Sequence, residues 1–331
     1  MRYLLRRVGF YIMALWISVT LNFIIPRLMP GDPGLAFLAR LQTRNTTLAQ
    51  LQAVRVAFGV NTDMPIWVQY GQYMNNLLHG DLGVSYTNFP QSVTSVIGEH
   101  LPWTIGLLGV AVIVSAVVGT LIGMLVAWRR GSWLDSIVPP FLTFISAIPY
   151  FWMALALLYL FGFLLGWFPI SGGYDVGSDI NPGWNMDFLA SVSQHALLPI
   201  VTLVVGALAG WVLTMRNTMV TTLSEDYVLM AQAKGLPERR VIFNYAARNA
   251  ILPSITSFAM SLGLIVNGAI LTEMVFSYPG IGMTLYNAIE GLDYTLVQGC
   301  FLVIAFTVLG ANFLSELLYT FLDPRVRQRK G

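Results

Sequence analysis

The sequence predicts an all-α membrane protein with six transmembrane helices and both termini in the cytoplasm. Hydrophobic residues make up 56% of its 331 residues and charged residues only 10%. Its mean hydropathy of +0.67 exceeds that of an average soluble domain. The stretch Gly106–Ala127 contains no charged side chain. At 1.5 Å per residue it spans roughly 33 Å, enough to cross a hydrocarbon core of about 30 Å.

Apolar runs of membrane-spanning length define the predicted helices in chain order. The first run follows three arginines and lacks a small-residue cleavage site, which predicts a retained signal anchor. In the third run, Pro139, Pro140 and Pro149 predict a helix that is kinked or starts late. The six runs are Val8–Leu28, Gly106–Ala127, Ile137–Phe168, Ala196–Met215, Ile251–Val275 and Leu296–Phe321.

The basic residues predict the orientation, because Lys and Arg near the ends of spans resist translocation. With a cytoplasmic N-terminus, 14 of the 18 basic residues lie inside and 4 outside. Six spans and two cytoplasmic termini satisfy this imbalance. The net charge of +2 gives no indication of nucleic-acid binding. The outside basic residues are Arg27, Arg40, Arg44 and Arg55.

The predicted spans divide the chain into four parts. Residues 1–30 form the N-terminal cytoplasmic end and first span, and 31–100 form an extracytoplasmic segment. Residues 101–321 form a five-helix core, and 322–331 a basic cytoplasmic tail. Apolar residues at helical spacing predict short outer helices at Thr47–Phe58 and Pro65–Leu78. The segment either docks a partner or caps the bundle, since loops serve both purposes.

The chain lacks the motifs of several enzyme and metal-binding classes. No phosphate-binding G-x-x-x-x-G-K-[ST] loop, H-E-x-x-H pair or G-x-S-x-G elbow is present. His79, His100 and His195 have no second ligand at metal spacing, so we interpret them as interfacial or capping residues. One cysteine, Cys300, builds no disulfide framework, and we expect it to be a small buried apolar residue.

Two acidic residues fall inside predicted spans, where charge is costly and often functional. Glu316 has Asn312 one turn before it on the same helix face. Because Glu316 lies near the cytoplasmic end, we interpret it as reaching water or nearby arginines, and its function stays open. We interpret Glu273, at the outer end of span five, in the same way. Two such groups at opposite ends do not form a proton or ion pathway.

The most polar cytoplasmic segment is SEDYVLMAQAKGLPERRVIFNYAARNAILP, Ser224 to Pro253. Ser224 is a suitable N-cap, and the acidic residues after it suit a helix N-terminus. Gly235 is expected to end this short helix, and Pro237 to begin a second one that leads into span five. The segment is either a partner-docking surface or an ordinary positively charged inside loop.

This segment resembles the EAA loop of binding-protein-dependent ABC importer permeases. The resemblance is closest to the first permease subunit of oligopeptide and dipeptide importers. The glutamate of the general pattern falls at Leu229 here, a variation that the peptide-importer branch shows. Further matching stretches lie in order along nearly the whole chain: PGDP at Pro30–Pro33, Phe58–Tyr86, IPYFW at Ile148–Trp152, WFPISGG at Trp167–Gly173, FSYPGIG at Phe276–Gly282, and LDPRVR at Leu322–Arg327.

The resemblance implies a transport subunit rather than an enzyme. It implies a prokaryotic inner-membrane location, a homologous second permease that completes the translocation path, and an extracytoplasmic substrate-binding protein. It also implies two cytoplasmic ATPases, which would hold the ATP and Mg²⁺, so no cofactor is expected in this chain. Residues 217–250 would couple the ATPases to the spans. The positions carried over are Ala231, Ala233, Lys234, Gly235, Leu236, Arg239, Arg240 and Pro253.

The resemblance leaves the substrate open. Peptides are the default of this branch, but oligosaccharides such as cello-oligomers, or nickel, are imported by similar machinery. The residues that line the path are not identified. A stand-alone secondary carrier is the alternative from another class, although it would more often show internal repeats. An intramembrane enzyme would need paired ionisable groups at mid-bilayer, which the sequence lacks.

Overall fold

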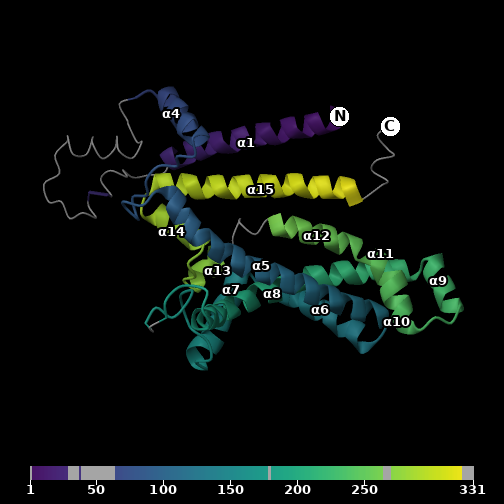
Figure 1. The fold of residues 1–331 in the computed structure, drawn as a ribbon. Helices are drawn as coiled ribbons and strands as arrows, with labels where there is room; N and C mark the ends of the chain where they lie inside the picture. The colour runs from purple at the N-terminus through teal and green to yellow at the C-terminus, as the bar shows by residue number, and fades with distance from the viewer. Residues whose placement is uncertain (1, 29–36, 39–63, 178–179, 264–269, 323–331) are drawn as a thin grey trace. The chain divides into compact units, whose positions relative to one another are not determined.

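Helices form the framework of the computed structural model, which describes residues 2–28, 37–38, 64–177, 180–263 and 270–322 (Figure 1). These residues contain no regular strand, only one isolated bridge between Val84 and Ser92. The helices are α1 (Arg2–Leu28), α4 (Ile66–Leu78), α5 (Val93–Trp128), α6 (Trp133–Ser146), α7 (Tyr150–Leu157), the π-helix η1 (Leu158–Leu164), α8 (Met186–Leu223), α9 (Asp226–Ala233), α10 (Glu238–Arg240), the π-helix η2 (Val241–Ala247), α11 (Arg248–Ala250), α12 (Leu252–Gly263), α13 (Ile270–Val275), α14 (Ile281–Glu290) and α15 (Tyr294–Leu322).

Four of these helices are long and apolar enough to cross a membrane: Arg7–Leu28, Val93–Trp128, Met186–Leu223 and Tyr294–Leu314. A fifth candidate is the pair Trp133–Ser146 and Tyr150–Leu164, which bends by 96°. This bend confirms the expected kink and places it at residues 147–149, which include Pro149, whereas Pro139 and Pro140 lie inside α6. The chain is therefore an integral, multi-pass membrane protein, and six spans stay a prediction because residues 264–269 in the fifth run lie outside the described residues.

Of the two expected outer helices, Thr47–Phe58 lies outside the described residues. The second is confirmed as a helix, α4, and its outer location stays a prediction. The chain divides into two units. The first comprises Met1–Thr104, Val266–Ile270 and Pro279–Phe313, and the second Ile105–Ile265, Leu271–Tyr278 and Leu314–Gly331. Residues of α5 and α15 thus belong to both units.

The core of the first unit lies where α14 and the beginnings of α5 and α15 meet. Val93, Ile97, Ile281, Leu285 and Val297 are among its buried residues. Cys300 belongs to this core and is fully buried, as the sequence predicted. Close contact is possible because Gly299 has no side chain. A Cβ there would overlap Val93 of α5.

Asp293 connects an outer loop of the first unit to the start of α15. Its Oδ1 accepts from Leu296 N at 3.0 Å, which caps the helix, and its Oδ2 accepts from Ser85 Oγ at 2.6 Å. Thr87 donates to the same Oδ2 through its backbone N and its Oγ1, both at 2.9 Å. The carboxylate is fully buried, so these four bonds replace its hydration. Burial also raises the pKa of the neighbouring Tyr86 phenol, which keeps it protonated.

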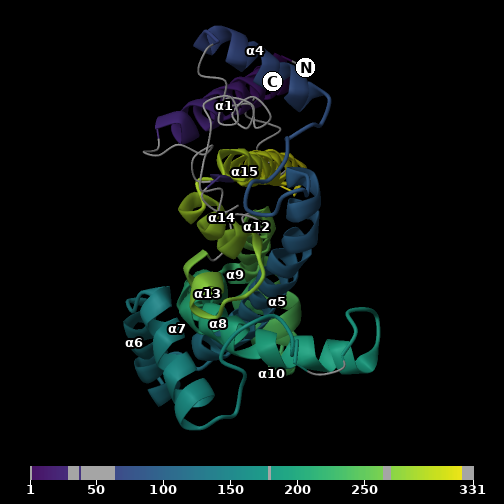
Figure 2. The same cartoon turned by 90° about the vertical axis from the view of Figure 1, so that its left-hand side faces the viewer.

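In the second unit, α8 is the helix against which the others pack. It contacts α6, α7, α11 and α12, and Figure 2 shows α6 and α7 beside it. Two glycines one turn apart, Gly119 and Gly123, bring α5 against it. A Cβ on Gly123 would lie 2.5 Å from Val212 O and 2.9 Å from Met215 Cβ. Small residues at this spacing let membrane helices approach closely, since apolar burial alone does not drive association in lipid.

Candidate functional site

The segment 224–250 forms a helical hairpin that follows directly from the end of α8. Its first arm is α9, and its second arm is the continuous run of α10, η2 and α11 (Figure 1). Gly235 ends the first arm with φ of +69°, a left-handed conformation that glycine adopts without a Cβ clash. The sequence predicted Pro237 as the first residue of the second helix. In the structure Pro237 is the N-cap of α10, and the helix begins one residue later, at Glu238.

The sequence prediction for Ser224 is wrong. This residue is the C-cap of α8, and its Oγ donates backward to Thr221 O at 2.7 Å. Glu225 takes the N-cap position of α9 instead, without a side-chain capping bond. The reason is that α8 continues to Leu223, so Ser224 is drawn into the end of that helix before the next one can begin.

The hairpin is held by a core of mostly small residues. Val228 and Ala231 from α9 pack against Val241, Ala246 and Ala250 from the second arm, and all five are buried. The same core includes side chains from the ends of α5 and α8, namely Met124, Ala127, Met215 and Met219. The hairpin and the ends of both long helices therefore share one packed core.

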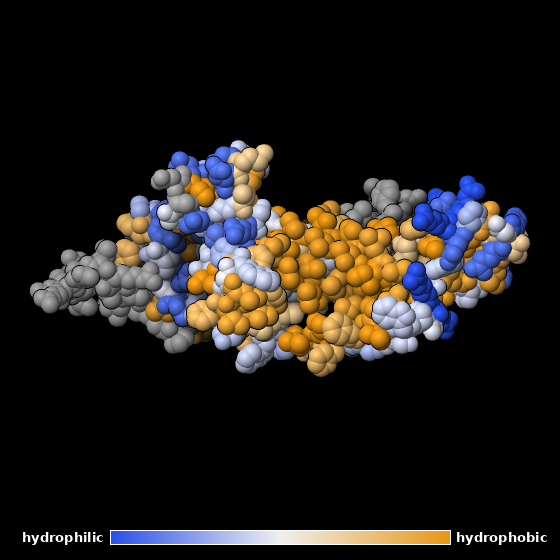
Figure 3. Space-filling model, turned by 90° about the horizontal axis from the view of Figure 1, so that it is seen from below, coloured by the Kyte–Doolittle hydropathy of each residue, from blue (hydrophilic) through white to orange (hydrophobic). Residues whose placement is uncertain are grey.

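The structure places most of the predicted site residues on one exposed turn. Ala233, Lys234, Gly235, Arg239 and Arg240 are all exposed, and the positive charges stand on both sides of the turn. Figure 3 shows hydrophilic residues gathered at the end of the second unit that carries α9 and α10, beside a broad apolar surface. This turn thus combines two small residues, Ala233 and Gly235, with three basic side chains.

Three predicted residues lie elsewhere. Ala231 is buried at 3% exposure, so any part it has in partner contact is indirect, through packing. Leu236 is half-buried and packs against the hairpin core. Pro253 is exposed as the second residue of α12, separated from the turn along the chain by η2 and α11.

Exposed apolar residues on the hairpin were missed by the sequence reasoning. Tyr227 and Met230 are 40% and 59% exposed on α9, and Phe243 is 54% exposed on η2. Tyr227 is held by a hydrogen bond from Asn249 Nδ2 to its hydroxyl at 2.8 Å. The i, i+3 spacing of Tyr227 and Met230 is the signal that marks them as one face. Leu229, where the glutamate of the general pattern falls, is also exposed, at 48%.

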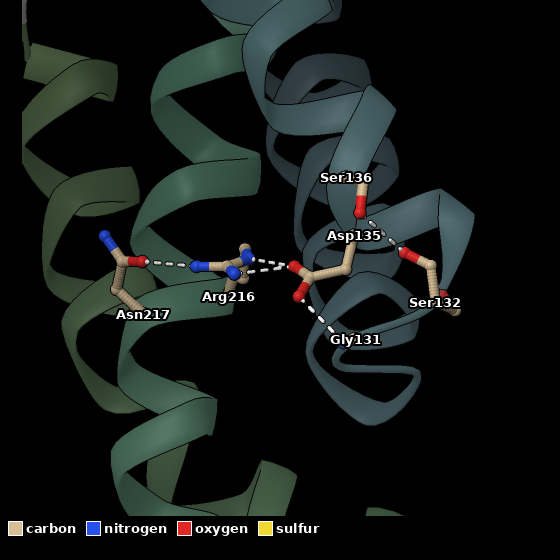
Figure 4. A network of polar contacts seen from close by, with 6 residues as sticks. All are labelled: Gly131, Ser132, Asp135, Ser136, Arg216 and Asn217. Carbon is tan, nitrogen blue, oxygen red and sulfur yellow. Dashed lines mark hydrogen bonds and ion pairs between the residues drawn. The ribbon is translucent and has the colours of Figure 1, made fainter.

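A salt bridge near the same end of the second unit joins α6 to α8. Arg216 donates from Nε and Nη2 to Asp135 Oδ1, each at 2.6 Å, and the two side chains are only 24% and 11% exposed. The other carboxylate oxygen accepts from Gly131 N at 3.0 Å, which closes the turn between α5 and α6 (Figure 4). Arg216 also donates to Asn217 Oδ1 at 3.2 Å. One carboxylate therefore links three elements.

The other sequence-predicted polar residues take local structural positions. Glu273 is fully buried within α13, so the expectation that it reaches water is wrong for this chain. The side chain of Glu316 lies outside the described residues. His79, His100 and His195 each place Nδ1 within 2.9 Å of a backbone carbonyl oxygen, of Asn75, Pro279 and Ser191 respectively.

Comparison with known proteins gives matches along the whole chain. Residues 119–328 match the family described as "Binding-protein-dependent transport system inner membrane component", and residues 1–108 match its N-terminal counterpart. The di/tripeptide transport system permease protein DppB of Pseudomonas aeruginosa (strain UCBPP-PA14) is 34% identical over 99% of both chains. A putative peptide transport system permease protein of Brucella abortus (strain 2308) is 35% identical over 98% of both. A probable peptide ABC transporter permease protein of Sinorhizobium fredii is 32% identical over 98% of this chain.

Proposed function

The chain belongs to the family of binding-protein-dependent transport system inner membrane components, and from this premise we propose that it carries peptides inward as part of an ATP-driven importer. Its own role is that of the membrane-embedded permease, which is not an enzyme. A second, homologous permease completes the path, two ATPases act from the cytoplasm, and an extracytoplasmic binding protein delivers the substrate. ATP and Mg²⁺ belong to the ATPases.

The observation that carries this proposal is how the hairpin is built. At its exposed turn, the small residues Ala233 and Gly235 let a partner approach the backbone. The positive charges of Lys234, Arg239 and Arg240 can orient that partner electrostatically. Behind the turn, the shared core joins the hairpin to the ends of α5 and α8. A partner that binds the turn and moves can therefore tilt α5 and α8 as rigid bodies. The exposed Tyr227, Met230 and Phe243 supply apolar and aromatic contact area beside the charges.

Co-purification with the ATPases tests this contact. We expect the tagged chain, expressed with its partners, to retain the ATPases, and the double variant Arg239→Glu/Arg240→Glu to lose them. The matched control is Arg129→Glu/Arg130→Glu, which makes the same charge change on the exposed turn between α5 and α6. Equal loss in the control would place the contact elsewhere. Absence of any ATPase from the unaltered complex would refute the proposal.

Energy coupling separates an ATP-driven importer from a stand-alone carrier. We expect vesicles containing the whole complex and the binding protein to accumulate substrate only when ATP reaches the ATPases. Vesicles containing this chain alone, with an imposed ion or proton gradient, are expected to accumulate nothing. Uptake by the chain alone would favour the carrier.

Peptides are the favoured substrate because the relatives named above are described as peptide transport proteins. A binding measurement on the partner binding protein decides this, with a dipeptide, a cello-oligosaccharide and Ni²⁺ compared side by side. Peptide binding alone is the expected result. Binding of the sugar or the metal alone would replace the substrate and leave the importer mechanism intact.

The proposed location is a prokaryotic inner membrane, with both termini in the cytoplasm. A cysteine introduced near residue 2 should resist a membrane-impermeant thiol reagent in intact cells, because the N-terminus is inside. Trp184→Cys should react, because Trp184 is 98% exposed on a predicted outer loop. The reverse labelling pattern would invert the topology. Cys300 is buried and contributes little background.

A further inference from the structure

Helix α4 carries an apolar stripe that the described part of the chain leaves uncovered. Trp67, Met74 and Leu78 lie at i, i+7 and i+11, which places them on one helix face. Trp67 is 73% and Leu78 82% exposed, and Met74 is half-buried. Gly71 falls in the same stripe, and a Cβ there would meet no atom within 4 Å. No residue of α4 is buried.

An adjacent face of α4 is fastened to the end of α1. The Tyr70 hydroxyl lies 2.8 Å from Thr20 Oγ1, and Arg27 Nε donates to Gln69 Oε1 at 3.4 Å. The Phe23 ring packs edge-on against Tyr70, with centroids 5.2 Å apart. The same phenylalanine lies under the Arg27 guanidinium, 3.6 Å from the ring centroid. These contacts orient α4 about its own axis.

The position of these contacts along α1 sets the depth of α4. The candidate span of α1 is Arg7–Leu28, 22 residues long. Thr20 is eight residues before Leu28, so the contacts fall within about 12 Å of that end at 1.5 Å per residue. Because the span is only slightly longer than a hydrocarbon core, this end lies at one boundary of the bilayer. Helix α4 is therefore held at the level of lipid headgroups and upper acyl chains.

The remaining face of α4 is mostly polar, apart from Val68, which is 40% exposed, and it carries no charge. Gln72, Asn75 and Asn76 are exposed there, and the sequence IWVQYGQYMNNLL contains no acidic or basic residue. The apolar arc is wider than its contact with α1, and the uncovered part is the stripe that holds Trp67. Tryptophan is enriched at membrane interfaces, so Trp67 in this uncovered stripe is typical of an interfacial helix.

We propose that α4 is an interfacial anchor whose stripe Trp67–Met74–Leu78 inserts into the lipids of the outer leaflet. The inference rests on membrane depth and does not depend on the transport role. It assigns lipid, rather than a protein partner, as the occupant of this face. Since α4 is uncharged, its insertion is driven by apolar area and should not depend on anionic lipid or on salt.

Nitroxide accessibility in vesicles tests the proposal on the full chain, alone and assembled with its partners. In a Cys300→Ala background, single variants Trp67→Cys and Leu78→Cys report the stripe, and Gln72→Cys and Asn76→Cys report the polar face. We expect spin labels at 67 and 78 to collide with dissolved oxygen and to lose collisions with a water-soluble nickel chelate. Labels at 72 and 76 are expected to show the reverse.

Two positions calibrate these measurements. Leu121→Cys, at a 54% exposed site of the apolar α5, is the lipid reference, and Trp184→Cys, at a 98% exposed loop site, is the water reference. Nickel access at 67 and 78 equal to that at 184 would overturn the proposal in favour of water. Shielding of 67 and 78 from both reagents would overturn it in favour of a protein cover. A change with phosphatidylglycerol content or salt would contradict insertion by apolar area.

A second measurement avoids cysteine substitution altogether. Lipids brominated near the headgroup quench tryptophans at that depth, so the quenched fraction should fall in Trp67→Phe relative to the unaltered chain. Trp184→Phe should leave the quenched signal unchanged, because Trp184 is placed in water. An unchanged quenched fraction in Trp67→Phe would overturn the proposal.

Discussion

The indole N–H of Trp128 donates a hydrogen bond to a carboxylate oxygen of Glu238, joining the last residue of α5 to the first residue of α10. Trp128 also packs against the hairpin core. The hairpin is therefore attached to α8 by the chain itself and to α5 by this bond and the core. Motion of the hairpin has two routes into the membrane-spanning helices.

The variant Trp128→Phe removes the indole N–H and keeps an aromatic ring in place. We expect the hairpin to lose about 1 kcal/mol of anchoring, because Glu238 is exposed and hydrogen bonds to charged groups are worth more only when desolvated. The ATPases should still co-purify, while transport per ATP hydrolysed falls. Trp133→Phe, at a 68% exposed site, is the control. Loss of ATPase binding in Trp128→Phe would show that the bond supports docking rather than transmission.

Gly235 tests the hairpin turn. A Cβ would meet no atom within 4 Å there, so any cost of substitution comes from its φ of +69°. Gly235→Ala should destabilise the turn by roughly 1–2 kcal/mol and lower ATPase-coupled transport, and Gly235→Asn should retain most of it, since Asn tolerates this conformation. Transport assays on both variants check this. Equal activity of the Ala and Asn variants would mean that the turn tolerates distortion.

Gly123 tests the contact between α5 and α8. Gly123→Ala places a methyl group against Val212 O and Met215, so we expect a loss of about 1–3 kcal/mol through overpacking. Thermal unfolding in detergent measures the loss as a lower midpoint. Gly109→Ala, on the same helix with no atom within 4 Å of the added Cβ, should be neutral or stabilising. Similar midpoints for the two variants would contradict the close contact.

Asp293→Ala should be among the most damaging substitutions in the first unit. It removes the cap of α15, worth about 1 kcal/mol, and leaves the buried Ser85 hydroxyl without its acceptor, at roughly 1–3 kcal/mol, with a smaller loss at the half-buried Thr87. The control is Asp81→Ala, since Asp81 is exposed and accepts a local hydrogen bond from Gly83 N at 2.8 Å. Limited proteolysis of the outer loop is the measurement, and equal protection of both variants would refute the prediction.

The Asp135–Arg216 salt bridge is best measured by a double-mutant cycle. Asp135→Asn and Arg216→Met each strand a partly buried partner, so both single variants should lose stability. The double variant should be less destabilised than the sum of the two, with a coupling energy between about 0.5 and 3 kcal/mol. Strictly additive losses would mean that the pair contributes nothing beyond its separate contacts.

Local sequence patterns determine many of the helices of this protein and the points where they break. Long apolar runs predict its membrane helices, because only a helix satisfies its own backbone hydrogen bonds within lipid. Gly235 and Pro237 predict the hairpin break, because the freedom of glycine at positive φ and the fixed φ of proline both act locally on the chain. The helical spacing in Pro65–Leu78 likewise predicts α4.

The tertiary structure decides which face of each helix is covered. Tyr227 and Ala231 lie four residues apart, about one turn along α9 and on one side of it, yet the packing of η2 and α11 buries Ala231 while Tyr227 stays 40% exposed. Glu273 is buried by neighbours that the local sequence does not reveal. Ser224 belongs to the helix before it because α8 continues to Leu223. These outcomes depend on the whole fold, since burial is set by which segments meet in space and a local pattern carries no record of its distant neighbours.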